Sequence, residues 1–203
     1  MKLNFDELIK QKTIDLSGKG LVDTEVDDTD DEETNIDPLI KVIERSTILE
    51  ELNLEDNELT LADGKLAKAI AKNKTIKVLG LSGNNIDDEG AEYIANMLAV
   101  NKTLQKISLQ SNNFGDYGAQ SIATSLLENT SLHTIDLGTN SIGDKGAQSI
   151  ATSLVMNTGI QEIYLDDNKI GDRGAEKIAD ALESNHNIET LDLSGNNTIS
   201  NIV

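Results

Sequence analysis

Ten side chains spread along the sequence, most of them acidic, could bind a partner through charge. Three of them, Asp136, Tyr164 and Asp192, follow one another at intervals of 28 residues. Carboxylates that gather on one surface attract a basic protein and speed its approach. We therefore expect a partner-binding surface composed of Glu51, Asn53, Glu55, Lys106, Asp136, Glu162, Tyr164, Asp166, Asp167 and Asp192.

Covalent or acid–base catalysis has little support in the sequence. His133 and His186 are isolated, because no nucleophile and carboxylate recur in register with them to complete a catalytic triad. The chain has no cysteine, which excludes thiol catalysis, disulfides and cysteine-based zinc sites. We therefore expect that the protein is not an enzyme, with no catalytic residues and no cofactor.

The acidic residues also fit a metal site poorly. Asp136 and Asp192 are expected on strands to either side of Tyr164. Neighbouring strands lie about 4.8 Å apart, so the two carboxylates would be about twice that distance apart and few oxygens would converge on calcium. The segment 22–36 has eight acidic residues, but it lacks the glycine and the terminal glutamate of an EF-hand loop. We expect a solvated patch and an exposed, mobile loop, with no metal.

The overall charge narrows the class of partner and the compartment. The net charge of −19 repels nucleic acid and anionic membrane surfaces, favours a protein with a basic surface, and opposes self-association, so we expect a monomer. The N-terminus, MKLNFDELIK, lacks the apolar core of a signal peptide. Together with the absence of cysteine, this predicts a cytoplasmic protein, or one delivered to a host cytosol if it comes from an intracellular bacterium.

A repeated pattern, LxxLxLxxNxIxxxGAxxIAxxLxxN, must position these side chains. Its first apolar residue falls on Leu49, Ile76, Leu104, Leu132, Ile160 and Ile188, with spacings of 27 and then 28 residues. A fixed period in this range predicts a solenoid whose units are stable only when stacked. We expect an N-terminal cap over 1–48, with a degenerate repeat and the acidic loop, and five full repeats and one partial repeat over 49–203.

Each repeat predicts a strand, a turn and a helix. In KVLGLSGNN, Leu79 and Leu81 alternate with small or polar residues, which indicates a half-buried strand. An asparagine follows each strand, and its amide can pair with backbone groups at the turn. These residues are Asn57, Asn84, Asn112, Asn140, Asn168 and Asn196. The glycosylation sequons at Asn73, Asn101 and Asn129 fall at the helix end of the repeat, so we interpret them as structural.

Several residues predict where helices begin and pack. N-caps are expected at the aspartates that stand two residues before the Gly-Ala pairs: Asp88, Asp116, Asp144 and Asp172. Asp37 is expected to cap a helix with Pro38 at its first position, and Thr60-x-x-Asp63 resembles a capping box. Inward side chains are expected at Leu39, Ile40 and Ile43. A short helix is expected over 3–10, followed by a degenerate strand whose apolar residues are Ile14, Leu16 and Leu21.

The strand motif, the asparagine and the helical half together resemble the leucine-rich repeat of the ribonuclease-inhibitor type, strongly over 49–203 and weakly over 11–48. The resemblance implies an α/β horseshoe-shaped solenoid with a parallel sheet on the concave side and helices on the convex side. Ribonuclease inhibitor, Ran GTPase-activating proteins, innate immune receptors, tropomodulins and bacterial effectors share this scaffold and differ in function.

These observations predict a protein-binding scaffold or adaptor that uses its concave face. Aromatic residues are only 2% of the chain, with Tyr164 alone expected on that face, so moderate and salt-sensitive affinity is expected. An actin-capping protein resembling tropomodulin is an alternative, based on the length of the array and on segments such as EELNLEDNEL. Regulation of a small GTPase is another alternative, although Arg45 and Arg173, the two arginines, are not expected to face the groove.

Overall fold

Strands and helices alternate along the chain and form two layers. The computed structural model describes residues 5–23 and 36–196. Its strands are β1 (Thr13–Asp15), β2 (Glu51–Asn53), β3 (Val78–Gly80), β4 (Lys106–Ser108), β5 (Thr134–Asp136), β6 (Glu162–Tyr164) and β7 (Thr190–Asp192). Its helices are α1 (Phe5–Leu8), α2 (Asp37–Arg45), α3 (Lys65–Lys72), α4 (Asp88–Val100), α5 (Asp116–Leu126), α6 (Asp144–Met156) and α7 (Asp172–Leu182).

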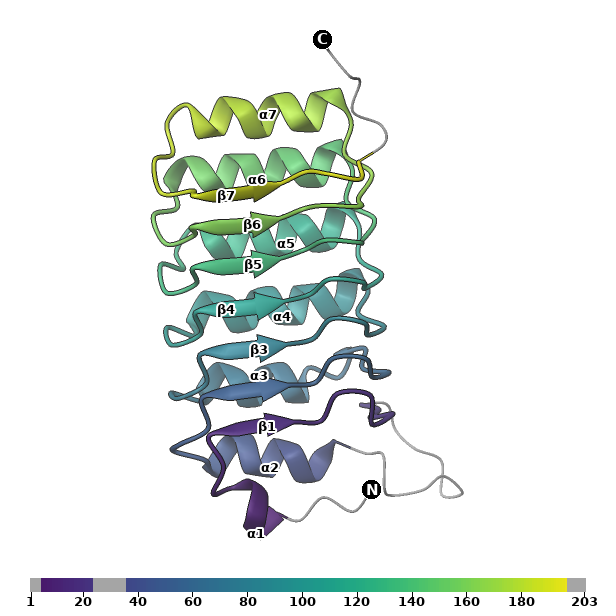
Figure 1. The fold of residues 1–203 in the computed structure, drawn as a ribbon, viewed down its shortest axis with the longest axis vertical. Helices are drawn as coiled ribbons and strands as arrows, with labels where there is room; N and C mark the ends of the chain where they lie inside the picture. Colours follow the sequence, from purple (N-terminus) through teal and green to yellow (C-terminus); the bar gives the residue numbers. More distant parts are fainter. Residues whose placement is uncertain (1–4, 24–35, 197–203) are drawn as a thin grey trace.

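The strands form one parallel sheet and pair in chain order from β1 to β7. Figure 1 shows the strands side by side in one layer, with α2 to α7 stacked in a second layer behind them. Successive helices are spread farther apart than successive strands, so the sheet lines the inner side of the arc. This architecture confirms the predicted α/β solenoid, with a parallel sheet on the concave side and helices on the convex side.

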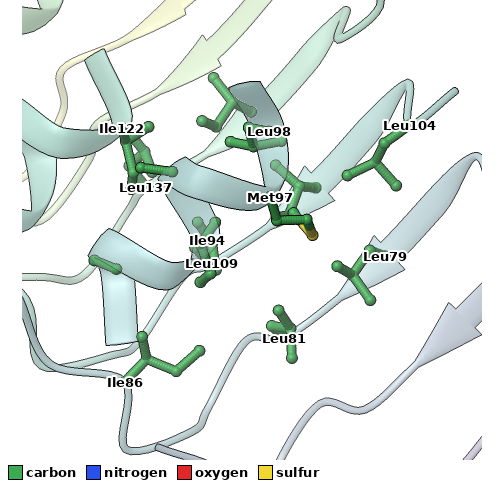
Figure 2. Close-up of a cluster of buried hydrophobic side chains, with 14 of the residues drawn as sticks. Leu79, Leu81, Ile86, Ile94, Met97, Leu98, Leu104, Leu109, Ile122 and Leu137 are labelled. Atoms are coloured by element: carbon green, nitrogen blue, oxygen red, sulfur yellow. The ribbon is translucent and has the colours of Figure 1, made fainter. Parts of the chain in front are cut away.

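The core lies between the two layers and repeats with the sequence. Leu79 and Leu81, which alternate with open positions along β3 and just beyond it, are buried as predicted. Ile94, Met97 and Leu98 project from α4 into the same cluster (Figure 2). Full burial of one such side chain contributes about 1.5–3 kcal/mol, and the same contact recurs in each repeat.

The asparagines that follow the strands form a buried ladder, here called the strand-side ladder: Asn57, Asn84, Asn112, Asn140, Asn168 and Asn196. Asn112 is typical, since its Nδ2 donates to the carbonyls of Leu81 and Leu109, each at 3.0 Å. Its Oδ1 accepts from the backbone N–H of Ile86 at 3.0 Å. Leu81 and Ile86 belong to the preceding repeat, so the predicted structural role of these asparagines is confirmed.

A second buried ladder runs along the C-terminal ends of the helices. This helix-end ladder consists of Asn73, Asn101, Asn129, Asn157 and Asn185. The Nδ2 of Asn129 donates to the carbonyls of Leu98 (2.7 Å) and Asn101 (3.2 Å) in the repeat before it. Its Oδ1 accepts from the backbone N–H groups of Ser131 and Leu132. The three sequon asparagines are therefore buried structural residues in the folded chain, as predicted.

The repeated aspartates do not cap their own helices, which corrects the prediction for Asp88, Asp116, Asp144 and Asp172. Each is the first helical residue, and the N-caps are Asp87, Gly115, Gly143 and Gly171. The carboxylate reaches the next repeat instead: Asp116 Oδ1 accepts from the N–H groups of Gly143 and Gly146, both at 2.8 Å. Asp88 and Asp144 make the same contacts. The unpaired N–H groups at a helix start attract an anion from whichever segment brings it close.

Gly146 makes this inter-repeat contact possible. A Cβ at this position would lie 2.9 Å from Asp116 Oδ1 and 3.0 Å from the Cβ of Ala119. The glycine therefore lets neighbouring helix starts approach each other.

The N-terminal part differs from prediction in its helix starts. Ile36 is the N-cap of α2, so Asp37 is its first residue rather than its cap, although proline does stand in the first turn. Val42 is fully buried where Ile40 was expected, and Ile40 is only partly buried. The capping box is not formed, because α3 begins after Gly64, which has a φ of 64°.

β1 pairs with β2 in the sheet, and Ile14 within it is buried, as are Leu16 and Leu21 beyond its end. α1 ends at Leu8, two residues before the predicted end of the helix. Most of the acidic segment, 24–35, lies outside the described residues. Its neighbour Asp23 is buried, and its carboxylate accepts from the backbone N–H of Thr60 at 2.8 Å.

Candidate functional site

The candidate site is the open face of the sheet. In each strand the middle residue is buried or nearly so, and the residues on either side of it turn toward the open face. Strand register aligns these outward residues in rows across the concave face. The central row runs through Asp15, Asn53, Gly80, Ser108, Asp136, Tyr164 and Asp192.

One group of acids surrounds Tyr164. We call Asp136, Glu162, Tyr164, Asp166 and Asp192 the C-terminal acidic cluster. Burial raises the pKa of the tyrosine hydroxyl, and the nearby charges of Glu162, Asp136 and Asp192 raise it further. The pKa of the Asp192 carboxyl is lowered, because it accepts hydrogen bonds from the Ser194 side chain and backbone. The cluster therefore presents several fixed negative charges around one aromatic ring.

The carboxylate of Asp166 lies close to Gly138 in the neighbouring repeat. A Cβ on Gly138 of the neighbouring repeat would lie 2.6 Å from Asp166 Oδ1, so the carboxylate occupies the space that the glycine leaves open. Burial raises the pKa of Asp166, and the charges of Asp136, Asp192 and Asp167 raise it further. The charged side chains that shift its pKa are all acidic, which favours the approach of a basic group from outside.

A shallow hollow of about 300 Å³ lies over β1 to β4, and we call it the N-terminal hollow. Its floor includes Gly80, and side chains from the adjacent repeat border it. A Cβ on Gly80 would lie 3.0 Å from Glu55 Oε1 and 3.1 Å from Asn53 Oδ1. Burial raises the pKa of Glu55, as do the charges of Asp56, Asp15 and Asp136, while Lys106 opposes the shift.

The structure brings nine of the ten predicted site residues onto the open face. Glu51, Asn53, Glu55 and Lys106 border the N-terminal hollow. The exception is Asp167, which lies in the turn after β6 with a φ of 49° and packs against Gly195. Between the two acidic regions, Ser82 and Ser108 form a hydrogen bond of 2.5 Å across β3 and β4.

The prediction missed Asp15, which borders the N-terminal hollow. The signal was present, because the sequence TIDL occurs both at 13–16 and at 134–137, so Asp15 takes the repeat position of Asp136.

The described residues also bear on the other candidate roles: metal binding, catalysis by histidine, regulation of a GTPase through arginine, and a membrane span. Within 5–23 and 36–196, no group of three or more His, Cys, Asp or Glu side chains is placed to hold a metal ion. His133 is half-buried just before β5, and His186 is exposed beyond α7. Arg45 lies in the last turn of α2 and Arg173 in α7, so neither is on the sheet. None of the described helices has the length and apolarity to cross a bilayer.

A family model described as "Leucine Rich repeat" matches residues 72–95, 100–123, 128–151, 157–179 and 184–202. These segments together cover more than half of the chain.

The chain belongs to the leucine-rich repeat family.

Several solved structures share its fold at low sequence identity. The leiomodin-1 actin-binding site 2 aligns with a TM-score of 0.56 and 17% identity, covering 91% of this chain and 90% of that one. The tropomodulin C-terminal domain of Caenorhabditis elegans aligns with a TM-score of 0.61 and 16% identity, covering 74% and 93%. Pollen receptor kinase 3 aligns with a TM-score of 0.51 and 18% identity, covering 93% and 75%. No curated protein sequence matches the chain.

Proposed function

We propose that this leucine-rich repeat chain, of the ribonuclease-inhibitor type, is a scaffold or adaptor whose concave face binds a basic surface of another protein. The observation that carries the proposal is the charge of that face. The outward positions on the strands and just beyond their ends bear seven carboxylates against one ammonium group, Lys106. The carboxylates are Asp15, Glu51, Glu55, Asp136, Glu162, Asp166 and Asp192.

The arrangement of these carboxylates supports two contact points. The C-terminal acidic cluster offers an aromatic ring among carboxylates, which suits an arginine or lysine side chain that packs its stem on the ring. The N-terminal hollow offers Glu55 and Asp15 beside a depression of about 300 Å³. An extended basic segment that crosses the strands would contact both.

A comparison of two charge-matched variants tests the proposal. The concave variant combines Asp136→Asn, Asp166→Asn and Asp192→Asn, and the convex variant combines Glu92→Gln, Glu176→Gln and Glu183→Gln. Each removes three negative charges at half-buried or exposed positions, so both should fold. Each variant and the parent are immobilised as bait in the same cell extract.

Proteins that bind the parent and the convex variant, are lost from the concave variant and elute as salt rises are the expected partners. Retention of the same proteins by both variants, or their loss from the convex variant alone, would contradict the proposal.

Actin is a second candidate partner, because two of the structural neighbours are actin-regulatory domains: the leiomodin-1 actin-binding site 2 and a tropomodulin C-terminal domain. The decisive assay measures polymerisation of purified actin from filament seeds in the presence of the chain. Slowed elongation that is relieved by the concave variant would support actin. Unchanged elongation at every chain concentration would exclude it as the partner of this face.

A cytoplasmic location, or a host cytosol, completes the proposal. It is supported by the absence of cysteine from the whole sequence. Fractionation of cells that express the full chain, with the protein detected in the cytosolic fraction, is the expected result.

A further inference from the structure

The outer faces of α5 and α6 differ in charge from those of the helices on either side. At one outward repeat position α4 and α7 carry the acids Glu92 and Glu176, whereas α5 and α6 carry Gln120 and Gln148. All four side chains are exposed, so packing of the core does not dictate the choice. The segment GAQSIATSL is identical at 118–126 and 146–154, so the same uncharged surface is presented twice.

Exposed apolar side chains gather on the same side of the molecule. Among the described residues, six large hydrophobic side chains are exposed, and five belong to α4, α5 and α6 or the residue that follows α5. Tyr117 is 77% exposed in the first turn of α5, and Met156 is 70% exposed at the end of α6. Leu127 and Val155 are about half exposed, at 47% and 48%, near the same helix ends.

The surface between α5 and α6 is also hollowed. Two depressions of about 410 and 180 Å³ lie between the helices. Gln120, Ser149 and Thr152 line both of them. Tyr117 also lines the larger one, together with one acidic and one basic residue, Asp116 and Lys145, whose charges are opposite. Ridges of side chains on another helix could fill such grooves. We call the outer surface of α5 and α6, from Tyr117 to Met156, the neutral face.

We propose that the neutral face is a self-association surface, occupied by a second copy of this chain in an antiparallel two-fold arrangement once salt screens the net charge that favours the expected monomer. Each copy carries a net charge of −19, so two copies repel one another over most of their surfaces. The neutral face is where that repulsion is weakest and where apolar side chains are already exposed.

The distribution of side chains along the helices suits the antiparallel arrangement. Tyr117 and Lys145 stand at the N-terminal ends of α5 and α6, and Glu128 and Met156 stand at or just beyond their C-terminal ends. In a two-fold pair with antiparallel helices, the N-terminal ends of one copy face the C-terminal ends of the other. The tyrosine ring then meets aliphatic side chains and the lysine approaches the glutamate, and symmetry makes each contact twice.

This surface and the concave face should respond to salt in opposite ways. Salt screens the repulsion between two copies of the chain, so self-association should strengthen as ionic strength rises. Binding of a basic partner to the concave carboxylates should weaken under the same change. The self-association proposal does not rest on the concave site and can fail independently of it.

Sedimentation equilibrium of the full chain tests the proposal, at low salt and at about 0.5 M NaCl, where the Debye length falls to a few ångström. The parent should be mainly monomeric at low salt and should shift toward a dimer with rising concentration at high salt. A parent that stays monomeric at every concentration and salt level would overturn the proposal.

A matched pair of variants locates the surface. Gln120→Glu with Gln148→Glu restores the acids that Glu92 and Glu176 already provide at this position, so folding should be unaffected. This change should raise the dimer dissociation constant by about tenfold or more through like-charge contact. Gln105→Glu with Gln161→Glu makes the same chemical change at exposed positions just before β4 and β6 and should leave dimerisation unchanged.

If both pairs of substitutions weakened the dimer equally, the effect would come from net charge alone. That result would overturn the assignment of the dimer contact to the neutral face. Tyr117→Ser provides a separate check without added charge: it should weaken the dimer, and an unchanged dimer would likewise contradict the assignment.

Discussion

The buried asparagine ladders and the concave carboxylates belong to the same repeats but differ in burial, in hydrogen bonding and in how much they vary between repeats. Asn129 is fully buried, and hydrogen bonds to backbone groups of two repeats satisfy its side chain. Asp166 is half-buried among other carboxylates, and its charge is disfavoured where it stands. The ladders are uniform from repeat to repeat because each asparagine meets the same backbone groups. The concave residues vary from repeat to repeat. Several accept a local hydrogen bond, as Asp136 does from the backbone N–H of Gly138, but their carboxylates still lie on the open face, where a partner can reach them.

The largest effect is expected from the helix-end ladder. Asn129→Ala removes the partners of carbonyl and N–H groups that are buried, so it should lower the free energy of unfolding by about 3 kcal/mol, since each unsatisfied buried group costs about 1–3 kcal/mol. Urea denaturation measures this loss. Asn96→Ala, at an exposed asparagine of α4, is the matched control and should cost nothing. Equal stability of the two variants would show that the ladder is dispensable.

Two asparagines of the strand-side ladder differ in the number of hydrogen bonds that their side chains make. Among the described residues, Asn140 Oδ1 is the buried side-chain polar atom without a hydrogen-bond partner, whereas Asn112 Oδ1 accepts from Ile86. Asn112→Ala should therefore cost about 2 kcal/mol and Asn140→Ala about 1 kcal/mol less, because one hydrogen bond fewer is lost. Parallel denaturation curves measure the difference. A larger loss for Asn140→Ala would contradict this explanation.

The inter-repeat caps should contribute less than the ladders. Asp116→Ala leaves the N–H groups of Gly143 and Gly146 without their acceptor and should cost about 1–2 kcal/mol, as loss of a helix cap does. Asp180→Ala, which removes an exposed acid paired with Lys177 on α7, should cost well under about 1 kcal/mol. Thermal melts of both variants provide the test, and a greater loss for Asp180→Ala would count against the inter-repeat role.

The concave acids should affect stability in the opposite direction. The pKa of Asp166 is raised in the folded chain, so its contribution to stability is greatest at low pH and is lost as pH rises through that raised pKa. At neutral pH the ionised carboxylate slightly lowers the free energy of unfolding. Asp166→Asn should therefore leave stability unchanged or slightly increase it at pH 7, and this gain should vanish in acid. A destabilised variant at pH 7 would mean that the carboxylate is structural.

The same pKa shifts predict how partner binding depends on pH. As pH falls, Asp166 and Glu55 should take up protons before ordinary carboxylates, while Asp192, whose pKa is lowered, stays charged longer. As pH is lowered, binding of a basic partner should begin to weaken at a pH above the range in which ordinary carboxylates titrate. Part of the binding should persist at a pH below that range. Isothermal titration across pH measures this profile. In Asp166→Asn the early part of the decline should be smaller.

The parts of the fold that follow from the repeat spacing and from the alternation of residues along a strand could be predicted from the sequence. Leu79 and Leu81 alternate as strand residues must, and Asn112 recurs where a buried turn needs an amide. The role of Asp116 could not be found in this way, because a motif within one repeat suggests a local cap, whereas the helix start that it caps belongs to the next repeat.

The sequence allowed the outward residues of the candidate site to be predicted, but not the contacts between them that shape its surface. Strand alternation placed Asp136 and Tyr164 on the open face. The N-terminal hollow depends on the way Glu55 and Asn53 border Gly80 from a neighbouring strand, and the position of Asp166 depends on the space above Gly138. These contacts join residues of different repeats, and no pattern within one repeat specifies them.

The central claim is that the concave carboxylates contact the partner. Carbodiimide cross-linking joins a carboxylate directly to a lysine in contact with it, and mass spectrometry of the chain bound to its retained partner identifies the residues joined. We predict cross-links from Asp136, Glu162, Asp166 and Asp192, with Glu55 at the other end of the face. Cross-links confined to the convex acids Glu92, Glu176 and Glu183 would contradict the account.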